Sequence, residues 1–279
     1  MGQLRDQMVM EMQLRNYSDK TIKDYTRHVV WYTKYFGCSP AELGEAEIKR
    51  YLHHLLVERE LSWSYVNVSY SALQFLYKKT LKRPWNVEQI PRPKTGLQLP
   101  EILSDKELLR LFDATNNFKH RMLLMITYAA GLRVSETAHL KLSHLDSDRM
   151  QIRVEQGKGR KDRYTLLSAP LLPELRRYYR QYRPLTYLFE GNKPGVPLAT
   201  ETIQKVFKAA RESAGIKKPA TVHTLRHCFA THLMENGVDL LTIRKLMGHR
   251  SIQTTLRYVR VRQEHIQTVV SPLDQLLVN

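Results

Sequence analysis

Residues 151–167 read QIRVEQGKGRKDRYTLL, and this stretch decides what kind of fold the chain adopts. Its two ends, 151–154 and 164–167, contain the β-branched and aromatic residues typical of short strands. The residues between them combine two glycines with four basic side chains, which predicts a hairpin with a basic tip (Gly157, Lys158, Gly159, Arg160, Lys161, Asp162, Arg163). Because helical patterns lie on both sides of this hairpin, the sequence predicts a mainly α fold with a small β-sheet.

Helices are predicted on both sides of the hairpin. Upstream, Ser104 and Glu107 have the spacing of a capping box, and an apolar helix follows over about 118–130, where Gly131 ends it. Downstream, the apolar spacing predicts helices at 172–182, 201–214, 222–236, 240–246 and 252–259.

A proline-rich stretch, residues 84–100, divides the chain. It holds four prolines and Gly96, which exclude a regular helix, so we expect an extended linker. The part before it, residues 1–83, shows helical spacing of its apolar residues. Ser18 is the expected cap of its first helix, and the predicted helices cover 18–37, 45–58 and 62–77.

The charge balance of the chain is strongly positive. The 279 residues include 44 Lys and Arg against 27 Asp and Glu, a net charge of +17 with a pI near 9.8. A surplus of this size attracts polyanions, of which nucleic acid is the commonest. A basic enzyme that never touches nucleic acid is the alternative that charge alone leaves open.

The cysteines and the apolar stretches favour a cytoplasmic location. Cys38 and Cys228 lie far apart and form no CxxC pair, so neither a disulfide framework nor a zinc ribbon is expected. Residues 1–16 lack the apolar core of a signal peptide. The most apolar stretch, 122–132, is too short to span a bilayer, so we expect no membrane partner.

Four short segments supply the groups that a phosphodiester reaction needs. In chain order they contribute Arg133, Lys158, His223 with Arg226, and His249 with Tyr258. No acidic cluster for two magnesium ions accompanies them, so cationic side chains would have to neutralise the phosphate. His223 and Arg226 share one helix face, and they lie near its positive end if that helix begins at Val222.

Each of these residues also has an ordinary structural interpretation when it is taken alone. Arg133 could be a surface charge or pair with Glu136, and one tyrosine among 15 is most often a core or edge residue. The histidines at 223, 227 and 232 are not spaced to place three ligands on one helix face, so a metal site is not expected.

Taken together and in order, the segments resemble the tyrosine recombinase (phage integrase) family, in particular its Xer-like two-domain members. The matching motifs are GLRVSE at 131–136, GKGRKDR at 157–163, HTLRH at 223–227 and MGHRSIQTTLRYV at 247–259. The resemblance covers nearly the whole chain and implies a two-domain DNA clamp. Its parts would be a helical, SAM-like core-binding domain (1–83), a linker (84–100) and a catalytic domain (101–279).

The resemblance also implies a role for each site residue. Tyr258 would attack the scissile phosphate and become joined to the DNA 3′ end, while Arg133 and Arg226 hold the non-bridging oxygens. Lys158 would protonate the departing 5′ oxygen, with Lys161 as a competing candidate. His223 would help to take the tyrosine proton, and His249 would hydrogen-bond the phosphate. Neither a metal nor another cofactor is implied.

The implied partners are double-stranded DNA recombination sites and further copies of the chain, as a tetramer on two sites. The apolar tail after Tyr258 would dock on a neighbouring protomer, or else pack on its own domain. We expect a nucleoid-associated cytoplasmic enzyme without an additional arm-binding domain. The motifs leave a mobile-element integrase and a chromosome resolvase open, and we favour the former.

Two other functions account for part of the pattern. A helix-turn-helix regulator would use residues 238–259, but it leaves Arg133, Lys158 and the His223–Arg226 pair without a role. A type IB topoisomerase would share the same residues, but it acts as a monomer. Detergent-resistant protein–DNA adducts separate an enzyme from a regulator, and a requirement for two DNA sites separates a recombinase from a topoisomerase.

Overall fold

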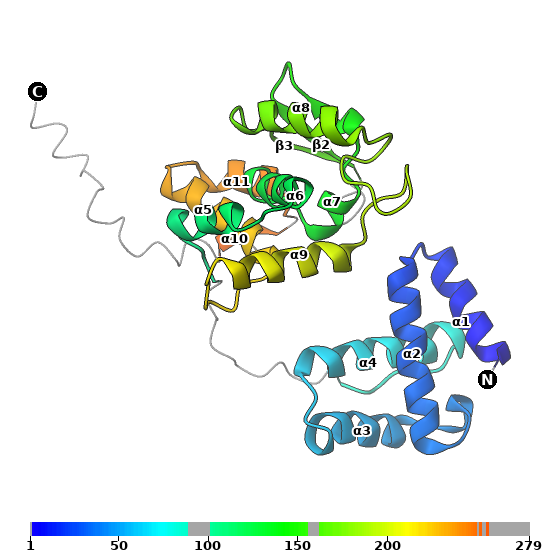
Figure 1. The fold of residues 1–279 in the computed structure, drawn as a ribbon. Helices are drawn as coiled ribbons and strands as arrows, with labels where there is room; N and C mark the ends of the chain where they lie inside the picture. The colour runs from blue at the N-terminus through cyan, green and yellow to red at the C-terminus, as the bar shows by residue number, and fades with distance from the viewer. Residues whose placement is uncertain (1, 89–100, 156–161, 250, 253–254, 257–279) are drawn as a thin grey trace, which may run out of the picture. The chain divides into compact units, whose positions relative to one another are not determined.

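The computed structural model describes residues 2–88, 101–155, 162–249, 251–252 and 255–256. The chain separates into two compact units, Met1–Gly96 and Leu97–Asn279, and helices predominate in both (Figure 1). This confirms the predicted mainly α fold with a small sheet. None of the helices within the described ranges has the length and apolar content needed to cross a membrane.

The first unit is a small helical bundle. Its helices are α1 (Gly2–Leu14), α2 (Asp19–Phe36), α3 (Glu45–His53) and α4 (Trp63–Phe75), with π-helical turns at His54–Glu58 and Leu76–Thr80. The Ser18 side chain caps α2 by accepting a hydrogen bond from the Thr21 N–H at 3.2 Å, as the sequence predicts. Helix α2 crosses α4, and their facing apolar side chains form the core of the unit (Figure 1).

Two features of this unit differ from the sequence pattern. Helix α1 is not predicted, because Met8 and Met12 are its only fully buried side chains and they form too narrow an apolar stripe. The packed unit also continues past residue 84. The Trp85 indole N–H donates to the Tyr70 hydroxyl at 3.0 Å, and that hydroxyl donates to the Val87 carbonyl at 3.0 Å.

The second unit surrounds the central helix α6 (Phe118–Ala129) with further helices and a small sheet. Upstream of α6 lies α5 (Asp105–Asp113), which begins with the predicted capping box at Ser104 and Glu107. The remaining helices are α7 (Val134–Ala138), α8 (Leu171–Tyr182), α9 (Thr200–Ser213), α10 (Val222–Glu235) and α11 (Leu240–Met247). The predicted helices at 118–130, 172–182, 201–214, 222–236 and 240–246 are thus confirmed to within a residue.

The sheet has three antiparallel strands in the order β1 (Leu145–Asp146), β2 (Gln151–Val154) and β3 (Arg163–Leu166). Strands β2 and β3 form the predicted hairpin, with Val154 opposite Arg163. Strand β3 starts one residue earlier than predicted, and β1 is too short to leave a pattern in the sequence. The hairpin tip, 156–161, lies outside the described residues.

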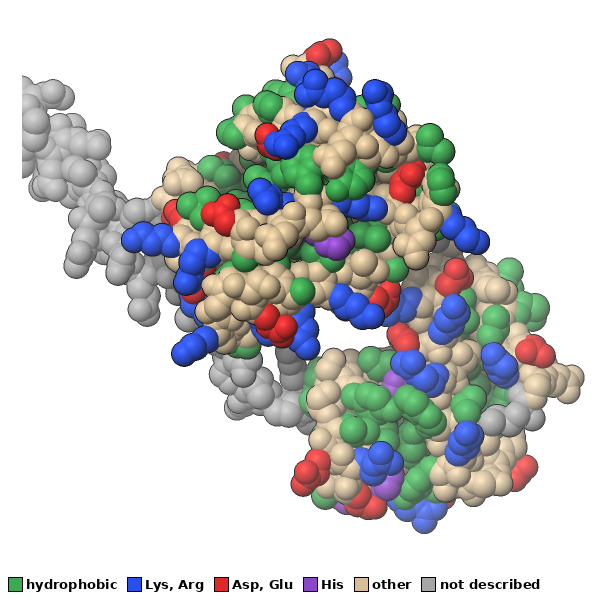
Figure 2. Space-filling view, in the orientation of Figure 1, with side chains coloured by type: hydrophobic (Ala, Val, Ile, Leu, Met, Phe, Trp, Pro, Cys, Tyr) green, Lys and Arg blue, Asp and Glu red, His purple; other side chains and the backbone are tan. Residues whose placement is uncertain are grey.

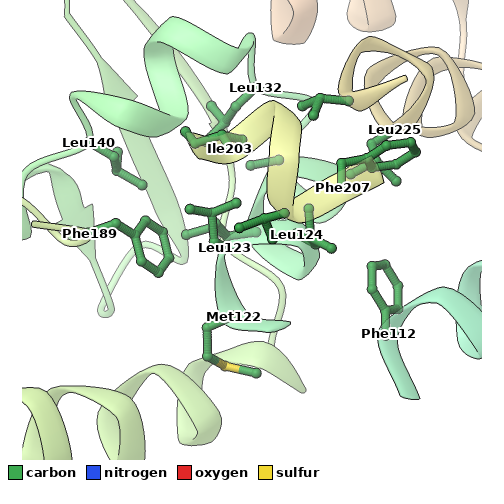
Figure 3. Close-up of a cluster of buried hydrophobic side chains, with 14 of the residues drawn as sticks. Phe112, Met122, Leu123, Leu124, Leu132, Leu140, Phe189, Ile203, Phe207 and Leu225 are labelled. Carbon is green, nitrogen blue, oxygen red and sulfur yellow. The ribbon is translucent and has the colours of Figure 1, made fainter. Parts of the chain in front are cut away.

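The core of the second unit forms around α6. Met122, Leu123 and Leu124 are fully buried there; Leu123 and Leu124 lie toward Ile203 and Phe207 of α9, whereas Met122 points away from them (Figure 3). Each such side chain contributes about 1.5–3 kcal/mol through burial. Helices α7, α9 and α10 pack around the same core. Side chains from α7 and α10 approach each other there, with Arg226 3.7 Å from Glu136.

Candidate active site

The carboxylate of Glu136 is the centre of a cluster of arginines in the second unit. Glu136 lies in the first turn of α7, where one of its oxygens accepts the Arg133 backbone N–H at 2.8 Å. Its side chain is only 5% exposed, and it meets guanidinium groups from three separate elements. Such a carboxylate is buried at a tolerable cost only because these partners compensate its charge.

Arg133 and Arg163 bind this carboxylate directly. The Arg133 Nη1 atom lies 2.6 Å from Glu136 Oε1, and the side chain of Arg133 remains 19% exposed. Arg163, at the start of β3, binds both oxygens, with Nη1 2.7 Å from Oε1 and Nη2 2.8 Å from Oε2. This two-point geometry is the one that a planar guanidinium forms best.

Arg226 reaches the same cluster from α10. Its Nη1 atom lies 3.7 Å from Glu136 Oε2, and its side chain is 2% exposed. Nη1 also donates to the Gly131 carbonyl and Nη2 to the Met247 carbonyl. Gly131 is required here, because its φ is +59° and a Cβ at this position would lie 2.3 Å from the Phe229 ring.

The end of α11 supplies three consecutive carbonyl groups to the three arginines. Leu246 accepts from Arg163 Nε at 2.8 Å, Met247 accepts from Arg226, and Gly248 accepts from Arg133 Nη2 at 3.4 Å. The last carbonyls of a helix have no partner within the helix and carry partial negative charge. The arginines therefore bind where the backbone itself attracts cations.

Two histidines complete this part of the site. His223 is in the first turn of α10, which begins at Val222 as predicted, and its ring meets that of His227 edge-on at 4.9 Å between centroids. Although His223 keeps an exposed face, the protein atoms packed around the imidazole lower its pKa, and the charges of Arg226 and Arg133 lower it further. His249 follows α11, and its Nδ1 atom lies 3.0 Å from the buried Thr255 hydroxyl.

The electrostatics of the cluster are dominated by its positive charges. Burial by itself raises the pKa of Glu136, but the bonds and charges of Arg163 and Arg133 outweigh it and lower the pKa to about 2. Burial, together with the charges of Arg226 and Arg133, lowers the pKa of His249 to about 3. At neutral pH the carboxylate is therefore ionised and this imidazole is neutral.

Both ends of the hairpin tip are held by ion pairs. Before the tip, Glu155 lies 3.3 Å from Lys141 Nζ. After it, Asp162 lies 3.1 Å from Arg153 Nη2. Lys158 and Lys161 belong to the tip itself and lie outside the described residues.

The structure brings four of the six predicted site residues together. Arg133 and Arg226 both approach the Glu136 carboxylate, and the histidines at 223 and 249 lie within the electrostatic reach of both arginines. Lys158 and Tyr258 lie outside the described residues. In the described ranges no group of three or more His, Cys, Asp or Glu side chains is placed to hold a metal ion.

Sequence reasoning missed Arg163 and the central position of Glu136. The sequence predicts Glu136 only as a partner for Arg133, although its place three residues after the Arg133 N-cap is a detectable signal. For Arg163 the signal is strand alternation, since Thr165 is fully buried and residue 163 shares its face of β3.

A cavity of about 460 Å³ opens beside His223, between α7, α9 and the start of α10. Basic side chains line part of it, among them Lys208 and Arg211. Lys and Arg side chains also spread over the visible face of each unit rather than forming a single patch (Figure 2). This distribution favours an extended polyanion over a small acidic ligand.

Comparisons with known proteins identify relatives of the chain. Residues 101–265 match a family described as the phage integrase family, and residues 4–87 match its N-terminal SAM-like domain. The protein y4qK of Sinorhizobium fredii is 40% identical over 277 residues, which are 99% of this chain and 90% of y4qK. Tyrosine recombinase XerA of Pyrococcus furiosus is 34% identical, over 68% of this chain and 67% of XerA.

A solved structure shows the same fold. The crystal structure of a lambda integrase tetramer bound to a Holliday junction superposes with a TM-score of 0.69 at 18% identity. The match covers 89% of this chain and 76% of that chain. Both units of the present chain therefore have counterparts in one larger protein of known fold.

Proposed function

The chain belongs to the phage integrase family and is a tyrosine recombinase, and we propose that it cuts and rejoins double-stranded DNA through a covalent bond between Tyr258 and the DNA 3′ end. The tyrosine oxygen attacks phosphorus as the bond to the 5′ oxygen breaks. The new phosphotyrosine ester retains the energy of the broken bond, so rejoining needs no nucleotide cofactor. A helix-turn-helix regulator without catalysis is not favoured, because it gives the arginine cluster no role.

The observation that carries this proposal is the convergence of Arg133 and Arg226 on one carboxylate. Their guanidinium groups lie 2.6 and 3.7 Å from Glu136 although the residues are 93 positions apart. Positive charge held in a site of low dielectric stabilises the negative charge that develops on phosphate in the transition state. Arg133 presents the more exposed of the two side chains, while Arg226 acts from beneath the surface.

The remaining roles follow from acid–base chemistry. A tyrosine with a pKa of about 10 is a poor nucleophile at neutral pH unless its proton is removed as it attacks. His223, whose lowered pKa keeps it neutral, accepts that proton, and neutral His249 hydrogen-bonds the phosphate. Lys158, which lies in the sequence between Glu155 and Asp162, protonates the departing 5′ oxygen.

Both units would contact the DNA. Residues 1–100 carry 15 basic and 10 acidic side chains, and residues 101–279 carry 29 and 17, so both parts are positive. The predicted arrangement is a clamp, with a core-binding domain at 1–83, a linker at 84–100 and a catalytic domain at 101–279. Since phosphate contacts would dominate affinity, binding should fall steeply with salt.

Recombination further requires several copies of the chain. The lambda integrase neighbour is a tetramer on a Holliday junction, which supports a tetramer on two DNA sites here. The apolar tail after Tyr258 would dock on the adjacent protomer and couple the active sites. Acting on DNA, the enzyme would be associated with the nucleoid, and we favour a mobile-element integrase over a chromosome resolvase.

The decisive experiment uses a nicked suicide substrate that carries the recombination site. Wild-type protein should form a denaturation-resistant adduct, and Tyr258→Phe should abolish the adduct without changing DNA affinity. Tyr164→Phe is the matched control, because its exposed hydroxyl on β3 has no role in the proposed chemistry. An adduct that survives Tyr258→Phe would disprove the assignment of the nucleophile, and the lack of any adduct with wild type would favour a regulator.

A further inference from the structure

Arg163 is the arginine of the cluster to which the proposed reaction gives no task. Its side chain is only 8% exposed, and its hydrogen bonds in the structure are all internal. Both terminal nitrogens bind Glu136, and Nε binds the Leu246 carbonyl. Because all three nitrogens are engaged in this way, Arg163 is placed to hold other groups rather than to bind phosphate.

The three arginines are ordered by the end of one helix. The consecutive carbonyls of residues 246–248 each accept a hydrogen bond from a different arginine, in the order Arg163, Arg226, Arg133. We refer to these carbonyls as the 246–248 platform. Arg163 connects the platform to Glu136 through three bonds, one of 2.8 Å to the platform and two of 2.7 and 2.8 Å to the carboxylate. Arg133 makes the same connection with only one bond of 2.6 Å to the carboxylate and a longer one of 3.4 Å to the platform.

The backbone at Gly248 passes directly over Arg163. A Cβ at residue 248 would lie 2.7 Å from Arg163 Cδ and 3.2 Å from Nε, and the φ of +62° also disfavours any other residue. The Arg163 side chain therefore fits closely beneath the turn that leads to His249. A side chain with different reach would change the position of this turn.

We propose that Arg163 is a positioning residue of DNA cleavage, which holds Glu136 against the 246–248 platform and thereby fixes the Arg133 and Arg226 guanidinium groups before phosphate binds. This inference rests on the proposed function of those two arginines. Without Arg163, both Glu136 oxygens lose a donor, and the carboxylate is drawn toward Arg133 and Arg226. It would then neutralise the charges that phosphate requires.

Lysine cannot replace Arg163 in this role. A single ammonium group can compensate the charge of Glu136, but it cannot form a two-point bond with the carboxylate and also reach the Leu246 carbonyl from a fixed plane. Arg163→Lys therefore retains the charge and loses the geometry. Arg163→Met removes both.

The test compares two DNA substrates that differ at the scissile phosphate. One is the natural phosphodiester, and in the other a methyl group replaces a non-bridging oxygen, which makes the ester neutral. A neutral ester has less need of correctly placed guanidinium groups, so a defect in their placement should matter less. Single-turnover adduct formation at saturating protein measures the chemical step separately from binding.

We expect Arg163→Met to slow cleavage of the phosphodiester by about 100-fold and Arg163→Lys by about 10-fold, the scale of a misplacement of ~1 Å. DNA affinity should stay near that of wild type. On the neutral substrate both variants should come within about 5-fold of wild type, because the neutral ester removes most of the electrostatic demand. Arg149→Met, at a side chain between β1 and β2 that is 80% exposed and makes only a 3.8 Å ion pair with Asp146, is the charge-matched control and should behave as wild type on both.

Equal slowing on the two substrates, or loss of DNA affinity that accounts for the slowing, would overturn the inference. If Arg163→Met does not fold, Arg163→Lys decides the question, since it keeps the positive charge that Glu136 needs. Failure of the proposed function has a different signature, namely an adduct that Tyr258→Phe still forms or that wild type never forms.

Discussion

Replacing Glu136 by glutamine should destabilise the second unit in a way that depends on pH. The substitution preserves shape but removes a carboxylate that pairs with three guanidinium groups. In the folded protein the pKa of Glu136 falls from an ordinary 4.5 to about 2. At 1.36 kcal/mol for each pKa unit, this difference corresponds to about 3 kcal/mol of stability at pH 7.

The sign of the pH dependence follows from the lowered pKa. The carboxylate contributes its full stabilisation above pH 4.5, and the contribution falls as the pH drops from 4.5 toward 2. The difference in unfolding free energy between wild type and Glu136→Gln should therefore decrease from about 3 kcal/mol at pH 7 to about 1 kcal/mol at pH 3. Since the Glu136 side chain is only 5% exposed, solvent screening does not reduce these values appreciably.

Urea unfolding at pH 7, 5 and 3 measures this effect with an internal reference. All three tryptophans, Trp31, Trp63 and Trp85, lie in the first unit, so their fluorescence should be unchanged while circular dichroism shows the loss. Glu212→Gln is the control, because that carboxylate is 58% exposed and should change stability by less than about 0.5 kcal/mol. A loss of equal size at pH 7 and pH 3, or one that the tryptophans report equally, would refute the reasoning.

Four further predictions concern the site and its supports. Gly131→Ala should lower the free energy of unfolding by about 2–5 kcal/mol, because its φ of +59° is left-handed and the new Cβ would clash with Phe229. Gly215→Ala, with φ +65° and nothing within 4 Å, should lower it by only about 1–2 kcal/mol. Similar urea midpoints for the two variants would contradict this. Arg133→Lys and Arg226→Lys should each slow adduct formation by about 100-fold or more with little change in DNA affinity, and a near-normal rate in either would argue against its role at the phosphate. The pKa of about 3 predicts that the His249 imidazole shows no NMR titration between pH 5 and 8. Because this pKa lies below the ordinary 6.5, protonation of His249 makes the folded protein less stable as the pH falls below 6.5. A titration midpoint near 6.5 in the folded protein would disprove the shift. Deleting residues 272–279 should impair recombination between two sites more than binding to one site, and equal loss of both activities would exclude coupling through the tail.

Most of the fold could be predicted because its signals are local. The helices at 118–129, 171–182, 200–213 and 222–235 have apolar residues at helical spacing, and all but the second carry a capping residue or a nearby glycine at one end. The β2–β3 hairpin was equally clear, since it breaks the helical pattern with glycines. Helix α1 and strand β1 were not predicted, because two buried methionines or a pair of residues give too little periodic signal.

The candidate site was predictable in its residues but not in its contacts. Arg133 and Arg226 could be selected by their chemistry and by the order of the motifs. Their partners depend on tertiary structure, since Arg226 donates to the Gly131 carbonyl 95 positions earlier and to the Met247 carbonyl 21 positions later. The sequence does not indicate which backbone carbonyl an arginine will bind. The contact of Arg163 with the Leu246 carbonyl could not be predicted for the same reason.

The contacts of the cluster explain how so many positive charges can share one small volume before DNA arrives. Three guanidinium groups and one carboxylate leave two positive charges, which repel one another strongly where water is excluded. The negative end of α11 reduces this repulsion, because each of its last carbonyls binds one arginine and holds it in place. The guanidinium groups are already oriented, which is the condition under which they stabilise a transition state without further reorganisation. If the proposed role of Arg163 holds, stability and catalysis depend on the same contacts: Glu136 compensates the positive charge of the cluster, and Arg163 holds Glu136 where that charge acts.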